Sequence, residues 1–142
     1  MTPLQNLLIK HEGKRNSPYK DSVGKTTLGV GHNLDDKPVS DAVVAQMLFD
    51  DISDARKDAR TLAWFNDLDV VRQDVVLNMI FNMGLSRFSG FKKMIAALEK
   101  QDFEMAATQM LDSAWSQQVG KRALELARMM VNGQYPDGVV DA

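Results

Sequence analysis

Two carboxylates and a hydroxyl lie close together near the N-terminus, where residues 11–32 read HEGKRNSPYKDSVGKTTLGVGH. Cleavage of a glycosidic bond needs two carboxyl groups that flank the oxygen, one protonated and one ionised. Glu12 is a candidate for the acid, and Asp21 for the carboxylate that acts on a water, with Thr27 helping to hold that water. Spacing alone favours an ordinary polar hairpin, because Glu and Asp are common near turns.

The local sequence predicts the elements that would position these residues. Pro3 and the leucines after it, at helical spacing, predict a short amphipathic helix that ends near Glu12. Proline and glycine then interrupt the helical pattern, which predicts a hairpin or a small three-stranded sheet over 14–32, turning near residues 22–25. The chain thus begins with a small mixed α and β piece.

The rest of the chain has a helical pattern. Ser40 predicts the N-cap of a helix that runs to about residue 62, and Asp69 the N-cap of a largely apolar helix that ends at Gly84. Further helical runs are expected at about 91–99, about 103–112 and about 121–132, and a loose tail over 134–142. The fold class predicted is therefore α+β and mostly helical, with the Ser40 helix as a bridge.

Composition excludes several classes of function. The chain has 142 residues, no cysteine and a formal net charge of −2. The charge argues against a nucleic-acid partner, and no apolar run is long enough to cross a bilayer. The N-terminus has no basic segment followed by a long apolar run, so we expect no signal peptide and no membrane insertion. Disulfide and thiolate chemistry is impossible.

A second group of residues has both structural and functional interpretations. His32 could be a base or a metal ligand, but a structural ion pair with Asp51 is favoured, because Asp51 falls on an apolar helix stripe and needs a counter-charge. Arg122 opens the last helix, where a cation gains nothing from the helix dipole. Its partner could be Glu12 or the neighbouring Glu125.

Three more side chains could line a cleft or stabilise the fold. Asn78 and Asn82 lie four apart, hence on one helix face, where they could bind sugar hydroxyls or satisfy nearby backbone groups. The structural interpretation is favoured for Asn78, and neither is favoured for Asn82. Trp115 could stack on a sugar, although a core position is favoured.

These motifs, taken in order, resemble the phage-type lysozymes. The resemblance covers about residues 4–132 and includes the Glu, Asp, Thr and Gly-x-Gly-His of residues 12–32, SDAVVAQMLFDDI, VRQDVVLNMIFNMG, FSGF and WSQQVGKRA. It implies one lysozyme-like domain with two lobes. The β lobe would span about 13–38, the helical lobe about 1–12 and 62–133, and the connecting helix about 40–61.

The resemblance also implies roles for individual residues. Glu12 would be the general acid, Asp21 would act on the water with Thr27, and Arg122 would pair with Glu12. His32 and Asp51 would form the structural ion pair. The residues where the family lines its cleft are Leu28, Phe81, Asn82 and Phe91. No metal or cofactor is implied.

The implied activity is a muramidase that cleaves the β-1,4 bond from N-acetylmuramic acid to N-acetylglucosamine in peptidoglycan. Inversion predicts carboxyl groups about 6.5–9.5 Å apart. We expect a monomeric endolysin made in the host cytoplasm, which reaches the wall with the help of a separate holin-like protein. A tail-associated enzyme, a prophage-derived bacterial enzyme and a non-catalytic wall-binding module are the alternatives.

The sequence departs from the family at two points. Between His32 and Ser40 it has only NLDDKPV, where a well-studied member carries a longer segment over the cleft, so subsite preferences do not transfer. Relatives of this kind are often strongly basic, whereas this chain is slightly acidic. We therefore expect weaker electrostatic capture by an anionic wall, and milder inhibition by salt.

Overall fold

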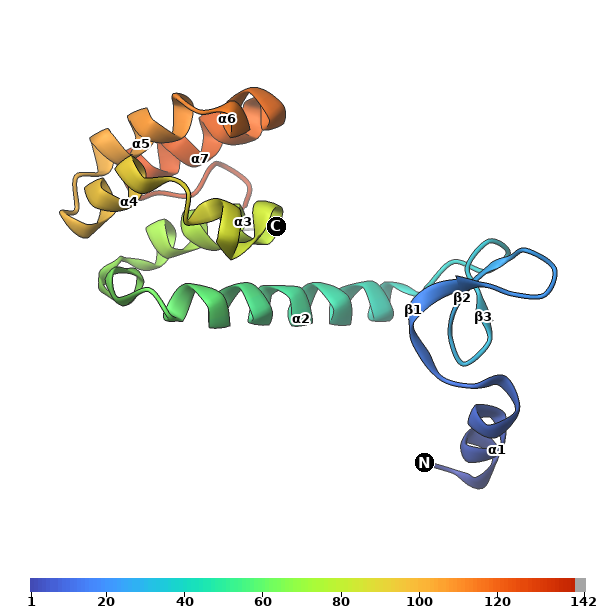
Figure 1. Cartoon of the computed structure of the whole chain (residues 1–142). Coiled ribbons are helices and arrows are strands. Elements are labelled where there is room, and N and C mark those ends of the chain that lie inside the picture. The colour runs from blue at the N-terminus through green and yellow to red at the C-terminus, as the bar shows by residue number, and fades with distance from the viewer. Residues whose placement is uncertain (140–142) are drawn as a thin grey trace. The chain divides into compact units, whose positions relative to one another are not determined.

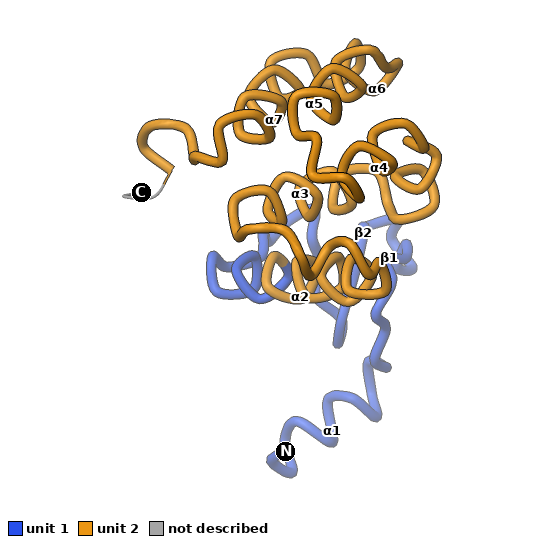
Figure 2. The backbone as a smooth tube through the Cα atoms, turned by 90° about the vertical axis from the view of Figure 1, so that its left-hand side faces the viewer, with its two compact units in different colours: residues 1–47 blue, residues 48–142 orange. Residues whose placement is uncertain are grey.

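The computed structural model describes residues 1–139 (Figure 1). The chain forms two compact units, residues 1–47 and 48–142, coloured separately in Figure 2. The long helix α2, Asp41–Arg60, contributes its first part to one unit and the remainder to the other. The expectation that residues 1–12 belong with the helical lobe remains a prediction.

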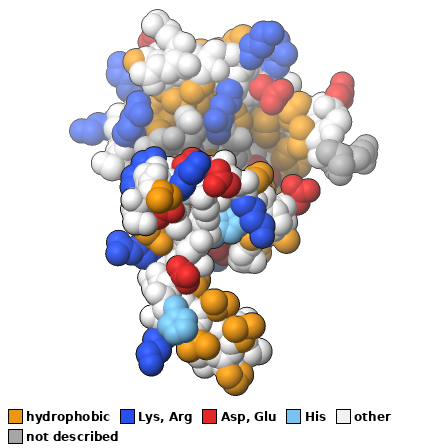
Figure 3. Space-filling view, turned by 90° about the vertical axis from the view of Figure 1, so that its right-hand side faces the viewer, with side chains coloured by type: hydrophobic (Ala, Val, Ile, Leu, Met, Phe, Trp, Pro, Cys, Tyr) orange, Lys and Arg blue, Asp and Glu red, His pale blue; other side chains and the backbone are white. Residues whose placement is uncertain are grey.

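The first unit begins with helix α1, Pro3–Glu12. Thr2 and Gln5 form a capping box, in which the Thr2 hydroxyl accepts from the Gln5 amide at 3.1 Å and the Gln5 side chain accepts from the Thr2 amide at 2.7 Å. Pro3 occupies the first helical turn, where its missing N–H is not needed. The exposed apolar side chains of this helix form the patch at the bottom of Figure 3; they are Leu4, Leu7 and Leu8.

The same unit contains a three-stranded antiparallel sheet in the order β1-β2-β3. The strands are β1, Arg15–Lys20, β2, Thr26–Gly29, and β3, His32–Asn33. Thr27 on the central strand pairs with Tyr19 on one side and Asn33 on the other. The register of β1 is irregular between Arg15 and Tyr19, a stretch that contains Pro18, and proline cannot donate to a ladder. The sheet predicted for this segment is confirmed.

The second unit is helical. After α2 come a short 3-10 helix, Ala63–Asp67, then α3, Val70–Phe88, α4, Lys92–Glu99, α5, Phe103–Leu111, α6, Ala114–Val119, and α7, Lys121–Asn132. Together with the small sheet, this confirms the mostly helical α+β fold class. None of residues 1–139 forms a helix that is both long and apolar enough to span a bilayer.

The helix ends follow from local chemistry. The side chain of Asp69 accepts from the Arg72 amide at 3.2 Å, which confirms the predicted N-cap of α3. Gly84 takes a left-handed, non-helical conformation, φ +83°, but the helical path resumes and continues to Phe88. The predicted end at Gly84 is therefore a break within α3. The 3-10 helix and α6 were not predicted.

Aromatic and methionine side chains fill the core of the second unit. The fully buried members with the largest volumes are Phe65, Phe88, Met79, Met94, Leu98, Met110 and Met130. Trp64, Phe88, Phe91 and Trp115 form a continuous series of ring contacts at 6.2–6.4 Å between centroids. Flexible methionines suit the irregular gaps between short helices.

Arg72 joins the start of α3 to the end of α7. Its guanidinium donates to the carbonyls of Met130 at 2.7 Å and Val131 at 2.9 Å, and it lies 3.7 Å from the ring centre of Phe103. It also pairs with Asp69 at 3.0 Å. Burial raises the pKa of Asp69, but hydrogen bonds from Arg72 outweigh this effect and hold that pKa below 3.8.

The segment after α7 is anchored at Tyr135. This side chain is partly buried against the core, and its hydroxyl donates to Asp74 on α3. The expectation of a loose tail is therefore wrong at Tyr135, because the phenol finds a carboxylate partner that the sequence pattern did not indicate. Residues 140–142 of that predicted tail lie outside the described residues.

Candidate active site

The loop after β1 fixes one oxygen of Asp21. Oδ1 accepts from the backbone amides of Val23 at 3.0 Å and Lys25 at 2.8 Å, and the Asp21 amide donates to the Lys25 carbonyl at 2.9 Å. Gly24, at φ +83°, allows the tight turn that this closure requires. Within residues 1–139, Oδ2 has no hydrogen-bond donor, so one carboxylate oxygen holds the loop and the other is available.

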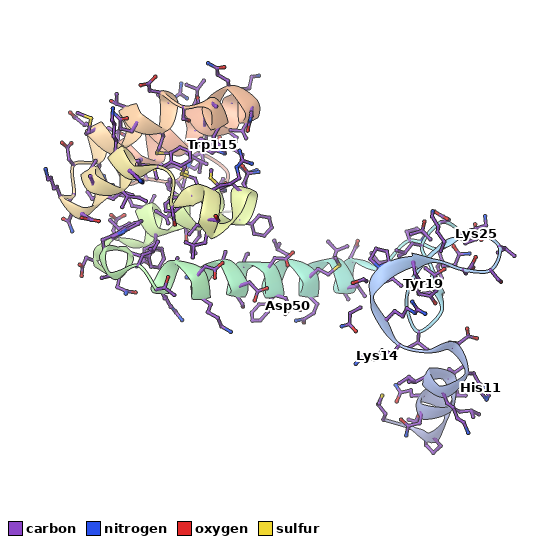
Figure 4. The ribbon with its side chains drawn as sticks, in the orientation of Figure 1. His11, Lys14, Tyr19, Lys25, Asp50 and Trp115 are labelled. Carbon is purple, nitrogen blue, oxygen red and sulfur yellow. The ribbon has the colours of Figure 1, made fainter. Side chains whose placement is uncertain are left out.

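Thr27 shares a backbone partner with Asp21. The Thr27 hydroxyl donates to the Lys25 carbonyl at 3.0 Å, the same oxygen that accepts from the Asp21 amide. Thr27 is only 3% exposed, on the central strand β2, whereas Lys25 lies in the adjoining loop (Figure 4). The Thr27 hydroxyl donates its only hydrogen to the Lys25 carbonyl. Toward any further partner, the hydroxyl oxygen can therefore only accept a hydrogen bond.

The carboxyl group of Glu12, at the end of α1, lies against the turn between β2 and β3. A Cβ placed on Gly31 would lie 3.0 Å from Oε2 of Glu12 and 3.3 Å from both Cδ and Cγ. The side chain of Glu12 is otherwise exposed. Glu12, Asp21 and Thr27 all belong to the first unit, so the small sheet and the helix before it contain the complete set of candidate catalytic residues.

His32 lies on β3 and contacts the polar turn that follows it. Its Nε2 is 2.8 Å from the carbonyl oxygen of Lys37. A carbonyl can only accept, so Nε2 carries a proton and Nδ1 is the nitrogen that remains for another partner. The predicted ion pair between His32 and Asp51 remains a prediction.

The short segment after His32 is stabilised by its own polar side chains. Oδ1 of Asn33 accepts from the amides of Asp35 at 3.0 Å and Asp36 at 3.2 Å. Asp35 accepts from the Thr26 amide at 2.8 Å, and Asp36 pairs with Lys25 at 3.2 Å. The sequence NLDDKPV is thus a closed turn against β2, which explains how so short a connection holds its shape.

In the second unit, Asn82 and Arg122 have partners that sequence reasoning did not assign. The indole Nε1 of Trp115 donates to Oδ1 of Asn82 at 2.8 Å. Arg122 donates to Oδ1 of Asn78 through Nε at 2.9 Å and Nη2 at 2.7 Å. Trp115 is 3% exposed, among the helices (Figure 4), so the core position favoured for it is correct. The proposed pairing of Arg122 with Glu12 remains a prediction.

The candidate cleft residues lie at different depths. Leu28 on β2 and Phe91 before α4 are half-buried, whereas Phe81 on α3 is 46% exposed. A hollow in the second unit has a lining that includes Phe81, Asn78 and Arg122, together with Asp74 and Leu77. Within residues 1–139, no three His, Asp or Glu side chains are placed to hold a metal ion.

The model of the family described as phage lysozyme matches residues 9–129. The chain belongs to the phage lysozyme family. This membership agrees with the fold class, and it places the chain among the lysozyme-type hydrolases.

Individual relatives in the family match most of the chain. The probable T4-type lysozyme 2 of Dictyostelium discoideum is 24% identical in an alignment 163 residues long. That alignment covers 94% of this chain and 96% of the relative. The probable T4-type lysozyme 1 of the same organism is 25% identical over the same shares. The pre-baseplate central spike protein Gp5 of Enterobacteria phage T4 is 26% identical over 160 residues, which cover 92% of this chain but 28% of Gp5.

Two contacts in this phage lysozyme chain had a signal in the sequence. Asp-x-x-Gly-Lys after a strand indicates a side chain that accepts from the amides of its own turn, which is how Asp21 is held. A buried Trp needs an acceptor for its N–H, although α3 carries several polar residues and the sequence does not show that Asn82 is the one it meets. Nothing in the sequence indicated the Asn78 partner of Arg122.

Proposed function

We propose that this phage lysozyme chain is a muramidase that cleaves the β-1,4 bond between N-acetylmuramic acid and N-acetylglucosamine in peptidoglycan, with inversion at the anomeric carbon. The observation that carries the proposal is the shared partner of Asp21 and Thr27. Both side chains are held by Lys25, so one carboxylate oxygen and one hydroxyl oxygen are presented from a rigid turn beside β2.

In this mechanism a water donates one hydrogen to Oδ2 of Asp21 and the other to the hydroxyl oxygen of Thr27. Its lone pair then attacks the anomeric carbon, and Asp21 takes the proton that is released. Glu12 gives its proton to the oxygen of the leaving sugar as the glycosidic bond breaks. Glu12 must therefore be protonated and Asp21 ionised at the start, and their carboxyl groups must leave room for a water.

The test is the release of reducing ends from purified peptidoglycan by the wild type and by Glu12→Gln. We expect release by the wild type alone, with both proteins folded by circular dichroism, because Gln keeps the shape of Glu12 but has no proton to give. Activity in Glu12→Gln at the wild-type level would remove Glu12 from its role. Proton NMR of the first product should show the α anomer, and a β anomer would exclude inversion.

The biological setting that we propose is an endolysin that acts on the wall after a separate holin-like protein opens the membrane. A tail-associated lysozyme is the second candidate, because the chain also matches part of a baseplate spike protein. Purified phage particles distinguish the two, since only a tail-associated enzyme would be found in them. A non-catalytic wall-binding module would sediment with sacculi and release no reducing ends.

A further inference from the structure

Two glycines close to each other in the β2–β3 region have nearly the same φ angle but different surroundings. Gly29 has φ +71° and Gly31 has φ +67°, both in the left-handed region. A Cβ on Gly29 would meet nothing within 4 Å, whereas a Cβ on Gly31 would press on the carboxyl end of Glu12. Backbone conformation alone explains glycine at 29, but at 31 there is a second constraint.

We propose that Gly31 is a positioning residue for Glu12, because the carboxyl group of Glu12 packs in the space that a side chain at position 31 would fill. This inference rests on the proposed function, in which Glu12 is the general acid. The contact involves three atoms of Glu12, namely Oε2, Cδ and Cγ, at 3.0–3.3 Å from the position of the missing Cβ. The end of the side chain therefore lies along the turn.

Glu12 needs such a contact because an exposed glutamate side chain is free to change rotamer. Glu12 is the last residue of α1, and its side chain is exposed apart from this turn. A long side chain in that position would sample several rotamers, whereas a general acid must stay within hydrogen-bond reach of the leaving oxygen. Contact with the Gly31 backbone removes the rotamers on one side. It also links the acid to the sheet that holds Asp21 and Thr27.

The test compares Gly31→Ala with Gly29→Ala as the matched control. Both add one methyl group at positive φ, so both are strained to a similar degree, but only the first displaces the carboxyl group. We expect kcat on purified peptidoglycan to fall roughly tenfold to a hundredfold more in Gly31→Ala, since small misplacements of a catalytic group cost that much. KM should change by a similar small factor in both variants.

A second measurement does not need activity. In the wild type, we expect nuclear Overhauser contacts between the Hγ protons of Glu12 and the Hα protons of Gly31. A thermodynamic cycle adds Glu12→Ala to each glycine variant. Any stability lost by Gly31→Ala beyond that lost by Gly29→Ala should vanish in this background, because the carboxyl group that the methyl displaces is gone.

Each outcome has a separate meaning. Equal falls in kcat for the two glycine variants, or the absence of the Glu12–Gly31 contact by NMR, would overturn the positioning role. If the wild type hydrolyses nothing, while the Glu12–Gly31 contact and the thermodynamic cycle are as expected, the proposed function is overturned. The packing of Glu12 against Gly31 then stands. A loss in Gly31→Ala that appears wholly in KM would also overturn the proposal, because a misplaced acid slows the chemical step.

Discussion

Trp115 donates its indole N–H to Oδ1 of Asn82 at 2.8 Å, which joins α6 to α3 in the helical unit. Trp115 is 3% exposed, and its ring meets Phe91 edge-on with 6.2 Å between centroids. The carbonyl oxygen of Asn82 therefore satisfies a buried donor. The amide N–H groups of Asn82 and the second lone pair of its carbonyl oxygen remain available to a ligand.

Removing that acceptor should destabilise the fold. Asn82→Ala leaves the Trp115 N–H buried without a partner, so we expect the free energy of unfolding to fall by about 1–3 kcal/mol. Asn82→Asp keeps an acceptor at the same place and should lose less. Urea denaturation followed by Trp fluorescence measures both variants. An Asn82→Ala protein as stable as the wild type would show that the bond contributes nothing.

Thr27 offers a test of the water-holding role. Thr27→Val keeps the shape of the buried side chain but removes the hydroxyl, so we expect kcat to fall roughly tenfold to a hundredfold. Stability should fall by only about 1 kcal/mol, since the Lys25 carbonyl still accepts from Asp21. Thr27→Ser retains the hydroxyl and should keep most of the activity. If Ser and Val are equally slow, the methyl group rather than the hydroxyl matters.

Arg72 should be among the more sensitive positions for stability. Arg72→Met removes the donors that satisfy the Met130 and Val131 carbonyls at the end of α7, and we expect a loss of ~3 kcal/mol. Arg72→Lys should lose most of the same stability, because an ammonium group cannot donate to both carbonyls in the geometry of a guanidinium. Exposed Arg128 on α7 is the control, and Arg128→Met should change stability by less than about 0.5 kcal/mol. Thermal denaturation compares the three.

We expect Tyr135 to make the stability of the fold depend on pH in the alkaline range. Its hydrogen bond to Asp74, with burial and the negative charges of Asp74 and Asp69, raises the pKa of Tyr135 from 10.0 to about 12. A raised pKa means that the folded state holds the proton more tightly than the unfolded state. The contribution of Tyr135 is therefore complete below about pH 10 and is lost as pH rises toward 12.

The measurement is absorbance titration of the two tyrosines, Tyr19 and Tyr135, beside Tyr135→Phe. We expect the high transition to be missing in Tyr135→Phe. The stability difference between wild type and variant should shrink above pH 10. A Tyr135 that titrates near its ordinary pKa of 10.0 would contradict the Asp74 bond.

Much of the molecule could be predicted from local sequence. Pro3, Ser40 and Asp69 mark helix starts, and Gly133 marks the end of α7 in a left-handed conformation. These signals act through neighbouring amides and carbonyls, so the information lies within a few residues. The Asp21 turn has the same local character, because its oxygen binds the amides of Val23 and Lys25.

Tertiary structure alone decided which distant groups meet. Arg72 reaches Met130, Tyr135 reaches Asp74, and Trp115 reaches Asn82, each over more than thirty positions along the chain. Such pairs depend on how the helices pack, and periodicity shows which face is apolar but not which polar atom it meets. The contact of Glu12 with Gly31 is of the same kind. The sequence by itself determined the candidate acid, base and hydroxyl, which are Glu12, Asp21 and Thr27. The fold determined that the carboxyl group of Glu12 packs against Gly31.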